Sequence, residues 1–193
     1  MSETFGDGDT PAMWPGFVSR GPTVGEAEVA AFEARCGFRL PPDYRRFLQE
    51  HNGGERAPAP RAEEEGVGDW VPQPRRVYSL GAAAAAGLSV EDALVLYGQA
   101  RWAEDWAALM EFPELTGDLE VQMRLCRGDG GPGYYPPELL PVADGDHDDL
   151  LLLRLDGSDI GAVYFSYDPD GYCEWHCHRV AESFAELLRD LGK

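Results

Sequence analysis

The sequence predicts an α+β fold with two N-terminal helices, a central, mainly antiparallel sheet, and a C-terminal helix packed on the sheet. Three observations predict it. Two helical patterns with clear start and stop residues occupy 23–54, strand patterns joined by a hairpin turn fill much of 150–178, and an amphipathic pattern covers 180–191. Because glycine (23) and proline (15) are abundant among the 193 residues, we expect one domain with long loops.

The first helix is expected to begin at Thr23, because Thr23 and Glu26 form the spacing of a capping box. Gly37 supplies the left-handed residue that commonly ends a helix. A second helix is expected to begin near Pro42. Proline has no backbone N–H, and in the first turn of a helix this costs nothing, because an N–H there has no partner within the helix. It ends at Asn52-Gly53-Gly54. Its predicted inner face consists of Tyr44, Phe47, Leu48 and His51.

Residues 55–130 are predicted to be a long insertion. Within it, 76–80 and 94–97 are typical of short strands, and tryptophans at helical spacing predict a helix over about 100–111. The alanine run 82–86 fits either a helical turn or a loop. Because long loops that carry aromatic and charged residues are often functional, we expect the insertion to determine specificity.

The last third of the chain is predicted to be rich in strands. The apolar run 150–155 is expected of a strand covered on both faces. Segments 162–167 and 172–178 flank Asp168-Pro169-Asp170-Gly171, in which proline fixes φ and glycine takes the positive-φ position, so the two segments read as a hairpin. Apolar residues of 180–191 recur at helical spacing and predict the closing helix.

The charge of the sequence is strongly negative, since 16 Lys and Arg against 35 Asp and Glu leave a formal charge of −19. Such a surface repels nucleic-acid phosphates and anionic membranes and attracts basic partners. No apolar run approaches the roughly 20 residues of a membrane span, and the N-terminus lacks the features of a signal peptide. With four sparse cysteines, these observations favour a cytoplasmic protein that contacts neither nucleic acid nor membrane.

The segment 173–178 is the part of the sequence with the most metal-binding residue types. In a strand, however, Cys173, Trp175 and Cys177 point to one face and the two histidines to the other, and ligands on opposite faces cannot share a metal unless a bulge intervenes. We therefore expect the Cys/Trp/Cys stripe to face the core and the histidines to face solvent. A zinc site is the alternative.

Other motifs of catalysis and ligand binding each fail at a defined position. The acidic run 144–149 begins like an EF-hand loop, but Asp149 and Leu155 stand where glycine and glutamate are required. The glycine-rich 128–133 lacks the Lys-Ser/Thr ending of a phosphate loop, and no G-x-S-x-G nucleophile elbow occurs. We therefore expect no cofactor and no enzymatic activity.

Ordered motifs lie near both ends of the chain. They are Phe32-Glu33, Leu40-Pro41-Pro42-Asp43-Tyr44, Phe47-Leu48, Asn52-Gly53-Gly54, Tyr135-Pro136-Pro137, Leu140-Pro141-Val142, Leu150–Leu155, Val163-Tyr164-Phe165 and Ser183–Leu188. In this order they resemble the SMI1/KNR4, or SUKH, superfamily over roughly 23–54 and 134–191. His147-Asp148-Asp149 departs from the Gly-Asp that the family often has before its strand. The resemblance predicts a SUKH-like domain over 22–193, and the Gly-, Asp- and Pro-rich segment 1–21 is expected to be an irregular arm.

This resemblance implies a protein-binding role without catalysis. Many bacterial members of the superfamily are immunity proteins that bind and neutralise a cognate polymorphic toxin, often a nuclease, and fungal members are hubs of cell-wall signalling. A charge of −19 is complementary to a basic nuclease. We expect an immunity protein, monomeric in its free form. The alternatives are a regulatory or scaffolding module without a toxin partner and, less favoured, a metal-binding protein.

The candidate partner-binding residues are acidic or aromatic. Trp70 lies in a predicted loop, where an exposed aromatic side chain makes a good interface anchor. Glu33 is either a surface carboxylate or one that lines the family's cleft. The full set is Glu33, Glu63, Glu64, Glu65, Trp70, Asp144, Asp146, Asp148 and Asp149.

Overall fold

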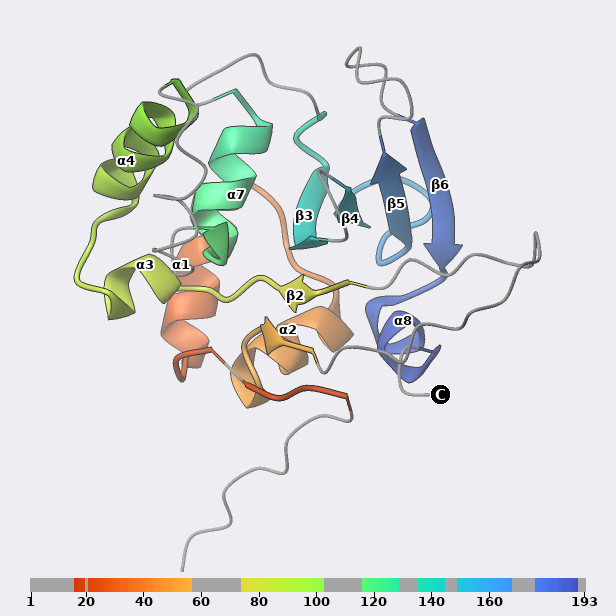
Figure 1. Ribbon diagram of the computed structural model, residues 1–193. Helices are drawn as coiled ribbons and strands as arrows, with labels where there is room; N and C mark the ends of the chain where they lie inside the picture. Colours follow the sequence, from red (N-terminus) through yellow and green to blue (C-terminus); the bar gives the residue numbers. More distant parts are fainter. Residues whose placement is uncertain are drawn as a thin grey trace, which may run out of the picture.

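A six-stranded antiparallel sheet forms the centre of the molecule (Figure 1). The computed structural model describes residues 16–19, 21–56, 74–102, 116–128, 135–144, 149–167 and 176–190. The strands are β1 (Gly54–Glu55), β2 (Arg76–Val77), β3 (Leu139–Asp144), β4 (Leu150–Arg154), β5 (Val163–Tyr167) and β6 (His176–Ala181). Each strand pairs with the next one along the chain, so the sheet is a meander with β1 and β6 at its two edges. The predicted antiparallel sheet is confirmed.

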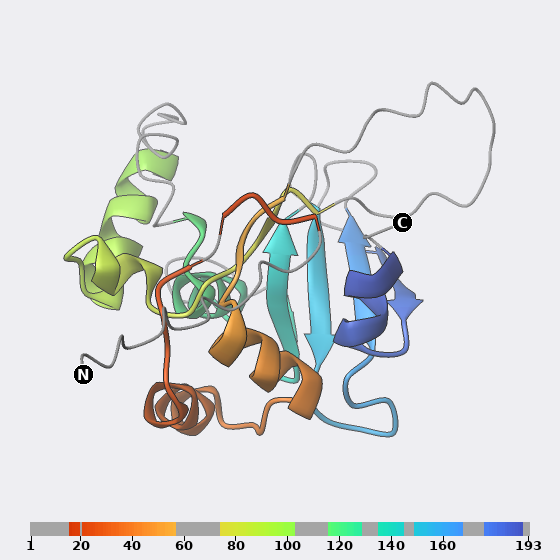
Figure 2. The ribbon, with the colours of Figure 1, turned by 90° about the horizontal axis from the view of Figure 1, so that it is seen from below.

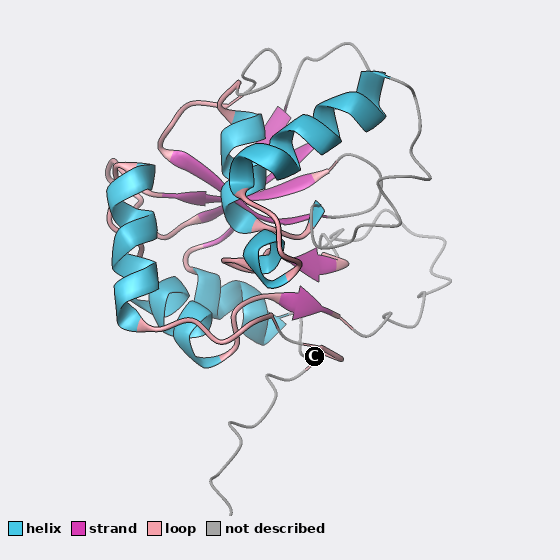
Figure 3. Ribbon diagram, turned by 90° about the vertical axis from the view of Figure 1, so that its left-hand side faces the viewer, coloured by secondary structure: helices cyan, strands magenta, loops and turns pink. Residues whose placement is uncertain are grey.

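Six helices surround this sheet in the described part of the chain. They are α1 (Glu26–Cys36), α2 (Pro42–Glu50), α3 (Ala82–Ala85), α4 (Val90–Trp102), α7 (Leu119–Cys126) and α8 (Phe184–Asp190). Figure 2 shows α1, α2 and α8 in that order along the sheet, from the side of β2 to that of β6. The other three helices belong to the connection from β2 to β3, where α7 contacts β3 and α4 contacts α7. Figure 3 shows these helices in front of the sheet.

The main core lies between the first face of the sheet and the helices α1, α2 and α8. Phe32, Tyr44, Phe47 and Phe184 are fully buried there, and the rings of Tyr44 and Phe184 meet edge to face with centroids 4.7 Å apart. Strand β4 is covered on both faces, because Leu151 and Leu153 belong to this core whereas Leu152 packs with Tyr135 on the second face. The predicted central strand, the closing helix and the inner face of the second helix are therefore confirmed.

The predicted start of the first helix is wrong by two residues. Gly25 is the N-cap, and its backbone N–H donates to the side chain of Glu28, so the Thr23–Glu26 pair does not form the cap. The predicted end is confirmed, since Gly37 adopts the left-handed conformation with φ 85°. The second helix begins at Pro42 and ends before Asn52, Gly53 and Gly54, which all have positive φ.

The insertion contains more regular structure than the sequence predicted. Leu94–Tyr97 was expected to be a strand but lies in α4, because Ser89 caps this helix through reciprocal hydrogen bonds with Asp92 and because Ala93 is buried among Ala83 and Val121. The predicted strand 76–80 is limited to β2, and α7 was not predicted. The second half of the predicted helix 100–111 lies outside the described residues.

Strand β6 corrects another expectation. Its first residues, His176, Cys177, His178 and Arg179, are all exposed, because β6 is an edge strand whose first half is open to solvent on both faces. Cys177 therefore does not face the core, whereas the solvent position of the two histidines is confirmed. Cys173 and Trp175 lie outside the described residues. Val180, expected in the closing helix, belongs to β6.

Candidate protein-binding site

Three connections of the meander leave and return at one end of the sheet. In a meander the links β1–β2, β3–β4 and β5–β6 all belong to the same end, and Figure 2 shows β3 and β5 pointing toward it while β4 points away. The strand residues that flank these links pair in register across all six strands. This row is Glu55, Arg76, Asp144, Leu150, Ser166 and Cys177.

The row lies on the face of the sheet opposite the main core. Directly paired residues in an antiparallel sheet share a face, and the neighbouring row, which contains Val77, Leu151 and Phe165, points into the core. The first three members, Glu55, Arg76 and Asp144, are charged, and we call them the polar row. Two carboxylates there flank one guanidinium, so the local charge is negative.

Arg76 is the fixed centre of the polar row. Its guanidinium donates to the Thr116 hydroxyl at 2.8 Å and lies 3.4 Å from the Glu55 carboxylate. Its backbone N–H donates to Asp144 Oδ1 at 2.9 Å. The Arg76 side chain is 22% exposed and that of Glu55 57%, so the carboxylate is the group that solvent and a partner reach first.

Asp144 is the half-buried member of the polar row. Burial raises the pKa of its carboxyl group to about 6, although the nearby Arg76 guanidinium and the Arg76 backbone N–H both favour the ionised form. Asp144 is the last residue of β3, and Asp149 lies, partly buried, immediately before β4.

A groove of about 470 Å³ adjoins the polar row along β1 and β2. Glu55 and Arg76 are its charged lining residues, and the other lining residues come from the N-terminal segment, β1, the segment that leads into α3, α3 itself and the residue before Asp118. These wall residues are small or compact: Ser19, Gly21, Pro22, Gly54, Ser79, Ala82, Ala85 and Gly117. The groove is open because no long side chain enters it from these walls.

Asn52 holds the walls of the groove together. Its buried side-chain amide donates to the carbonyls of Pro22 and Leu80, and its Oδ1 accepts from the Leu80 N–H at 2.8 Å. Its carbonyl accepts from the N–H of Gly21 at 3.0 Å. A Cβ at Gly21 would lie 2.1 Å from that carbonyl oxygen, so only glycine fits. Because every polar group of Asn52 is used, the arm, α2 and the start of α3 are fixed relative to one another.

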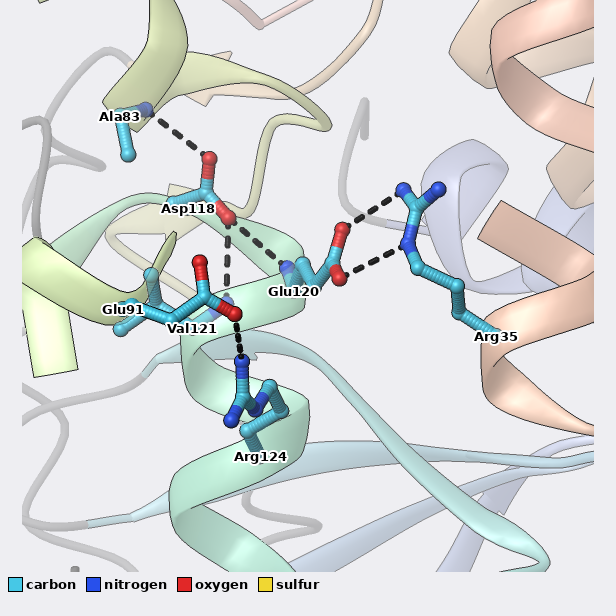
Figure 4. A network of polar contacts seen from close by, with 7 residues as sticks. All are labelled: Arg35, Ala83, Glu91, Asp118, Glu120, Val121 and Arg124. Atoms are coloured by element: carbon cyan, nitrogen blue, oxygen red, sulfur yellow. Dashed lines mark hydrogen bonds and ion pairs between the residues drawn. The ribbon is translucent and has the colours of Figure 1, made fainter. Parts of the chain in front are cut away.

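Asp118 fixes the wall that α3 provides (Figure 4). Its carboxylate accepts from the N–H groups of Glu120 and Val121 at the start of α7 and from the N–H of Ala83 in α3. Burial raises the pKa of Asp118, although these three N–H groups favour the charged form. Glu120, two residues after Asp118, accepts two hydrogen bonds from the guanidinium of Arg35 in α1. The insertion is thereby anchored to the N-terminal helices.

Glu33 is buried, so the interpretation of it as a surface carboxylate is wrong. Although desolvation opposes the charge, hydrogen bonds from Arg45, the Leu40 N–H and Arg39 lower the pKa of Glu33 below its usual value. The carboxylate lies 2.8 Å from the guanidinium of Arg39 and 2.6 Å from that of Arg45. This geometry joins α1 to the start of α2. A contact of Glu33 with a partner stays a prediction.

The other predicted partner-binding residues divide into two groups. Asp144 and Asp149 flank the β3–β4 link at the end of the sheet described above. Glu63, Glu64, Glu65, Trp70, Asp146 and Asp148 lie outside the described residues. Sequence reasoning missed Glu55, Arg76 and Asn52 as site residues. Asn52 carried a signal, because the left-handed Asn-Gly pair was recognised only as the end of a helix.

Cysteine and histidine side chains do not converge in the described structure. Burial raises the pKa of the Cys36 thiol and raises that of Cys126 to about 12, so both thiols stay protonated at neutral pH. His51 packs in the core against Phe17 and Phe47, whereas Cys177 is exposed on β6. Within the described ranges, no group of three or more His, Cys, Asp or Glu could hold a metal ion.

Residues 23–190 match the model of the SMI1 / KNR4 family (SUKH-1), which covers most of the chain. Searches of curated proteins and of solved structures gave no match. Among the described residues, no helix is long and apolar enough to cross a membrane.

Proposed function

Because the chain belongs to the SMI1/KNR4 family (SUKH-1), we propose that it is an immunity protein that binds a cognate toxin and neutralises it by occlusion. The binding requires no cofactor and no catalytic step. The partner is a basic protein, such as a nuclease toxin, because the chain carries a formal charge of −19 and because described arginines are already engaged within the fold. These arginines are Arg35, Arg39, Arg45, Arg76, Arg124, Arg154 and Arg179.

The polar row is the observation that supports this proposal most directly. It places an exposed and a half-buried carboxylate on either side of Arg76, at the end of the sheet from which the β1–β2 and β3–β4 links leave. Those links contain Glu63, Glu64, Glu65, Trp70, Asp146 and Asp148, so the predicted binding residues belong to segments that begin beside the polar row. We propose that residues 22–193 act as one cytoplasmic binding domain, with 55–130 as its specificity insertion and 1–21 as an arm.

The test is rescue of cells from the toxin. Co-expression with a toxin domain encoded next to this gene should restore growth, and the two proteins should elute as one complex in size-exclusion chromatography. The double variant Glu55→Gln/Asp144→Asn should lose rescue. A matched variant, Glu50→Gln/Asp92→Asn, removes two carboxylates at other exposed positions and should still protect.

Two outcomes would contradict the proposal. If the wild-type protein neither rescues cells nor binds the toxin, the immunity function is wrong and a regulatory or scaffolding role becomes the better explanation. If both double variants lose rescue equally, the total negative charge decides binding and the polar row has no special part in it.

A further inference from the structure

The groove beside the polar row has a shape and a charge that suit one kind of occupant. Its walls are formed by glycine, alanine, serine and proline, which leave room for an extended side chain and present little charge. Its charged lining residues are Glu55, whose side chain is more than half exposed, and the less exposed Arg76. A long aliphatic stem with a cationic head combines the two properties that such a groove accommodates.

We propose that the groove binds an arginine or lysine side chain of the partner protein, with the cationic head at Glu55 and the stem along Ala82 and Ala85. This inference rests on the proposed function and names the contact that the partner makes. Ser19 also lines the groove, and its hydroxyl, which accepts from the Glu55 N–H, has a second lone pair that can accept from an N–H group of the head. Charge-assisted hydrogen bonds of this kind are among the strongest in protein interfaces.

Arg76 does not prevent the entry of a second cation. Its guanidinium is held by Thr116, and its single charge lies between the two carboxylates of the polar row. The guanidinium of Arg76 lies 3.4 Å from Glu55 Oε1, and the Glu55 side chain stays 57% exposed, so a group of the partner can reach this carboxylate. Arg76 therefore orients Glu55 as an acceptor.

The groove is also preorganised. The Glu55 N–H donates to the Ser19 hydroxyl at 2.9 Å, and the Val18 N–H donates to the Glu55 carbonyl at 2.9 Å, so the arm covers the edge of β1. Asn52 and Asp118 fix the other two walls, as described above. Because a rigid groove loses little conformational entropy of its own when a side chain enters, we expect even one cationic side chain to bind measurably.

Short peptides test the groove without the toxin. The probes are Ac-Gly-Arg-Gly-NH2, Ac-Gly-Lys-Gly-NH2 and the neutral Ac-Gly-norleucine-Gly-NH2, titrated into the ¹⁵N-labelled 21.2 kDa protein and followed by NMR. The cationic peptides should shift the amide resonances of Ser19, Gly54 and Ala85, and the norleucine peptide should not. The comparison of arginine with lysine identifies the preferred head group. Equal shifts from the neutral peptide would overturn the proposal.

Two pairs of matched variants locate the binding. Glu55→Gln should weaken binding of the cationic peptides at least fivefold, whereas Glu50→Gln, at another exposed carboxylate, should change it less than twofold. Ala85→Trp should fill the groove and weaken binding similarly. Ala84→Trp adds the same side chain at an exposed position of α3 that does not line the groove, so it should have no effect. Equal effects within either pair would refute the assignment.

The same variants separate this inference from the proposed function. In the complex with the toxin, Glu55→Gln and Ala85→Trp should weaken affinity at least tenfold. A toxin complex that forms normally with both variants would overturn the groove contact and leave the immunity function intact. Groove-specific binding of the peptides, without any toxin complex, would support the cation site and contradict the immunity function.

Discussion

Carboxylates occupy two contrasting regions of this molecule. Asp118 and Glu33 are buried at the junctions between helices, where backbone N–H groups or guanidinium groups surround them. Glu55 and Asp144 lie on one row at the end of the sheet, where one is exposed and the other half-buried. The first region uses negative charge to hold the fold, and we propose that the second leaves it available to a partner. The composition of the chain, with its 35 acidic residues, does not distinguish these uses.

The two regions should respond differently to substitution. A buried carboxylate that satisfies several donors leaves all of them unpaired when it is removed, so its loss should lower stability. A carboxylate at an exposed or half-buried position is only partly desolvated, so its loss should chiefly change binding.

Asp118→Ala should give the largest loss of stability. It leaves the N–H groups of Ala83, Glu120 and Val121 without their acceptor and removes the N-cap of α7. Loss of a cap together with buried unpaired donors predicts a decrease of about 3–5 kcal/mol in the free energy of unfolding. Urea denaturation at neutral pH measures this change.

Asp118→Asn provides the graded comparison. The amide oxygen still accepts from Glu120 and Val121, but the NH₂ group cannot accept from Ala83. The loss should therefore be about half as large as for alanine. If both variants retained wild-type stability, the buried network of Figure 4 would have no part in holding α3 against α7.

The parts of the fold that the sequence predicted are those that local signals determine. Proline at the start of α2 and Asn52-Gly53-Gly54 at its end specify a helix with little help from the rest of the chain. In contrast, Leu94–Tyr97 is apolar enough for either a strand or a helix. Its conformation depends on the Ser89 cap and on Ala93, which packs against residues far away in the sequence. Such tertiary contacts cannot be read from the segment itself.

The candidate site was predicted less well than the fold, for the same reason. A run of aspartates drew attention to Asp144, but Glu55 and Arg76 carried no motif. They became part of a candidate site only because the register of β1, β2 and β3 places them in one row with Asp144. Glu33 shows the opposite case, since its place beside Phe32 gave no sign that Arg39 and Arg45 would enclose it.

Glu33→Gln should have the second largest effect. At neutral pH the neutral side chain cannot balance the guanidinium groups of Arg39 and Arg45, so unfolding should require about 2 kcal/mol less free energy. Because the pKa of Glu33 is lowered in the folded protein, its stabilising contribution is complete above the ordinary value of 4.5 and decreases as the pH falls further. The difference in the free energy of unfolding between wild type and variant should therefore become smaller in acid.

The matched variant Glu50→Gln disrupts the exposed pair with Arg46 and should change the free energy of unfolding by less than about 0.5 kcal/mol.

Asp144→Asn should have the smallest effect on stability and the opposite sign. The pKa of Asp144 is raised to about 6 in the folded protein, against roughly 3.9 in an unfolded chain, so the folded state binds a proton more readily between these values. The contribution of this carboxyl group to the free energy of unfolding is therefore complete below about pH 4. It decreases as the pH rises to 6 and stays low above pH 6. Asparagine keeps an acceptor for the Arg76 N–H but carries no charge. At pH 7 the variant should be more stable than wild type by about 1–2 kcal/mol, and at pH 4 the two should be equal.

The effect of Asp144→Asn on binding then decides which region Asp144 belongs to. A residue that serves only the fold would improve stability when neutralised and leave toxin affinity unchanged. A residue of the binding surface should show both changes at once, with a higher free energy of unfolding and an affinity reduced at least threefold at pH 7, because rim charges contribute modestly to interfaces. Isothermal titration calorimetry at pH 7 measures the affinity, and Asp92→Asn, at an exposed position of α4, is the control for net charge. Unchanged affinity would restrict the binding surface to Glu55 and the groove, and would place Asp144 with the carboxylates that affect only folding.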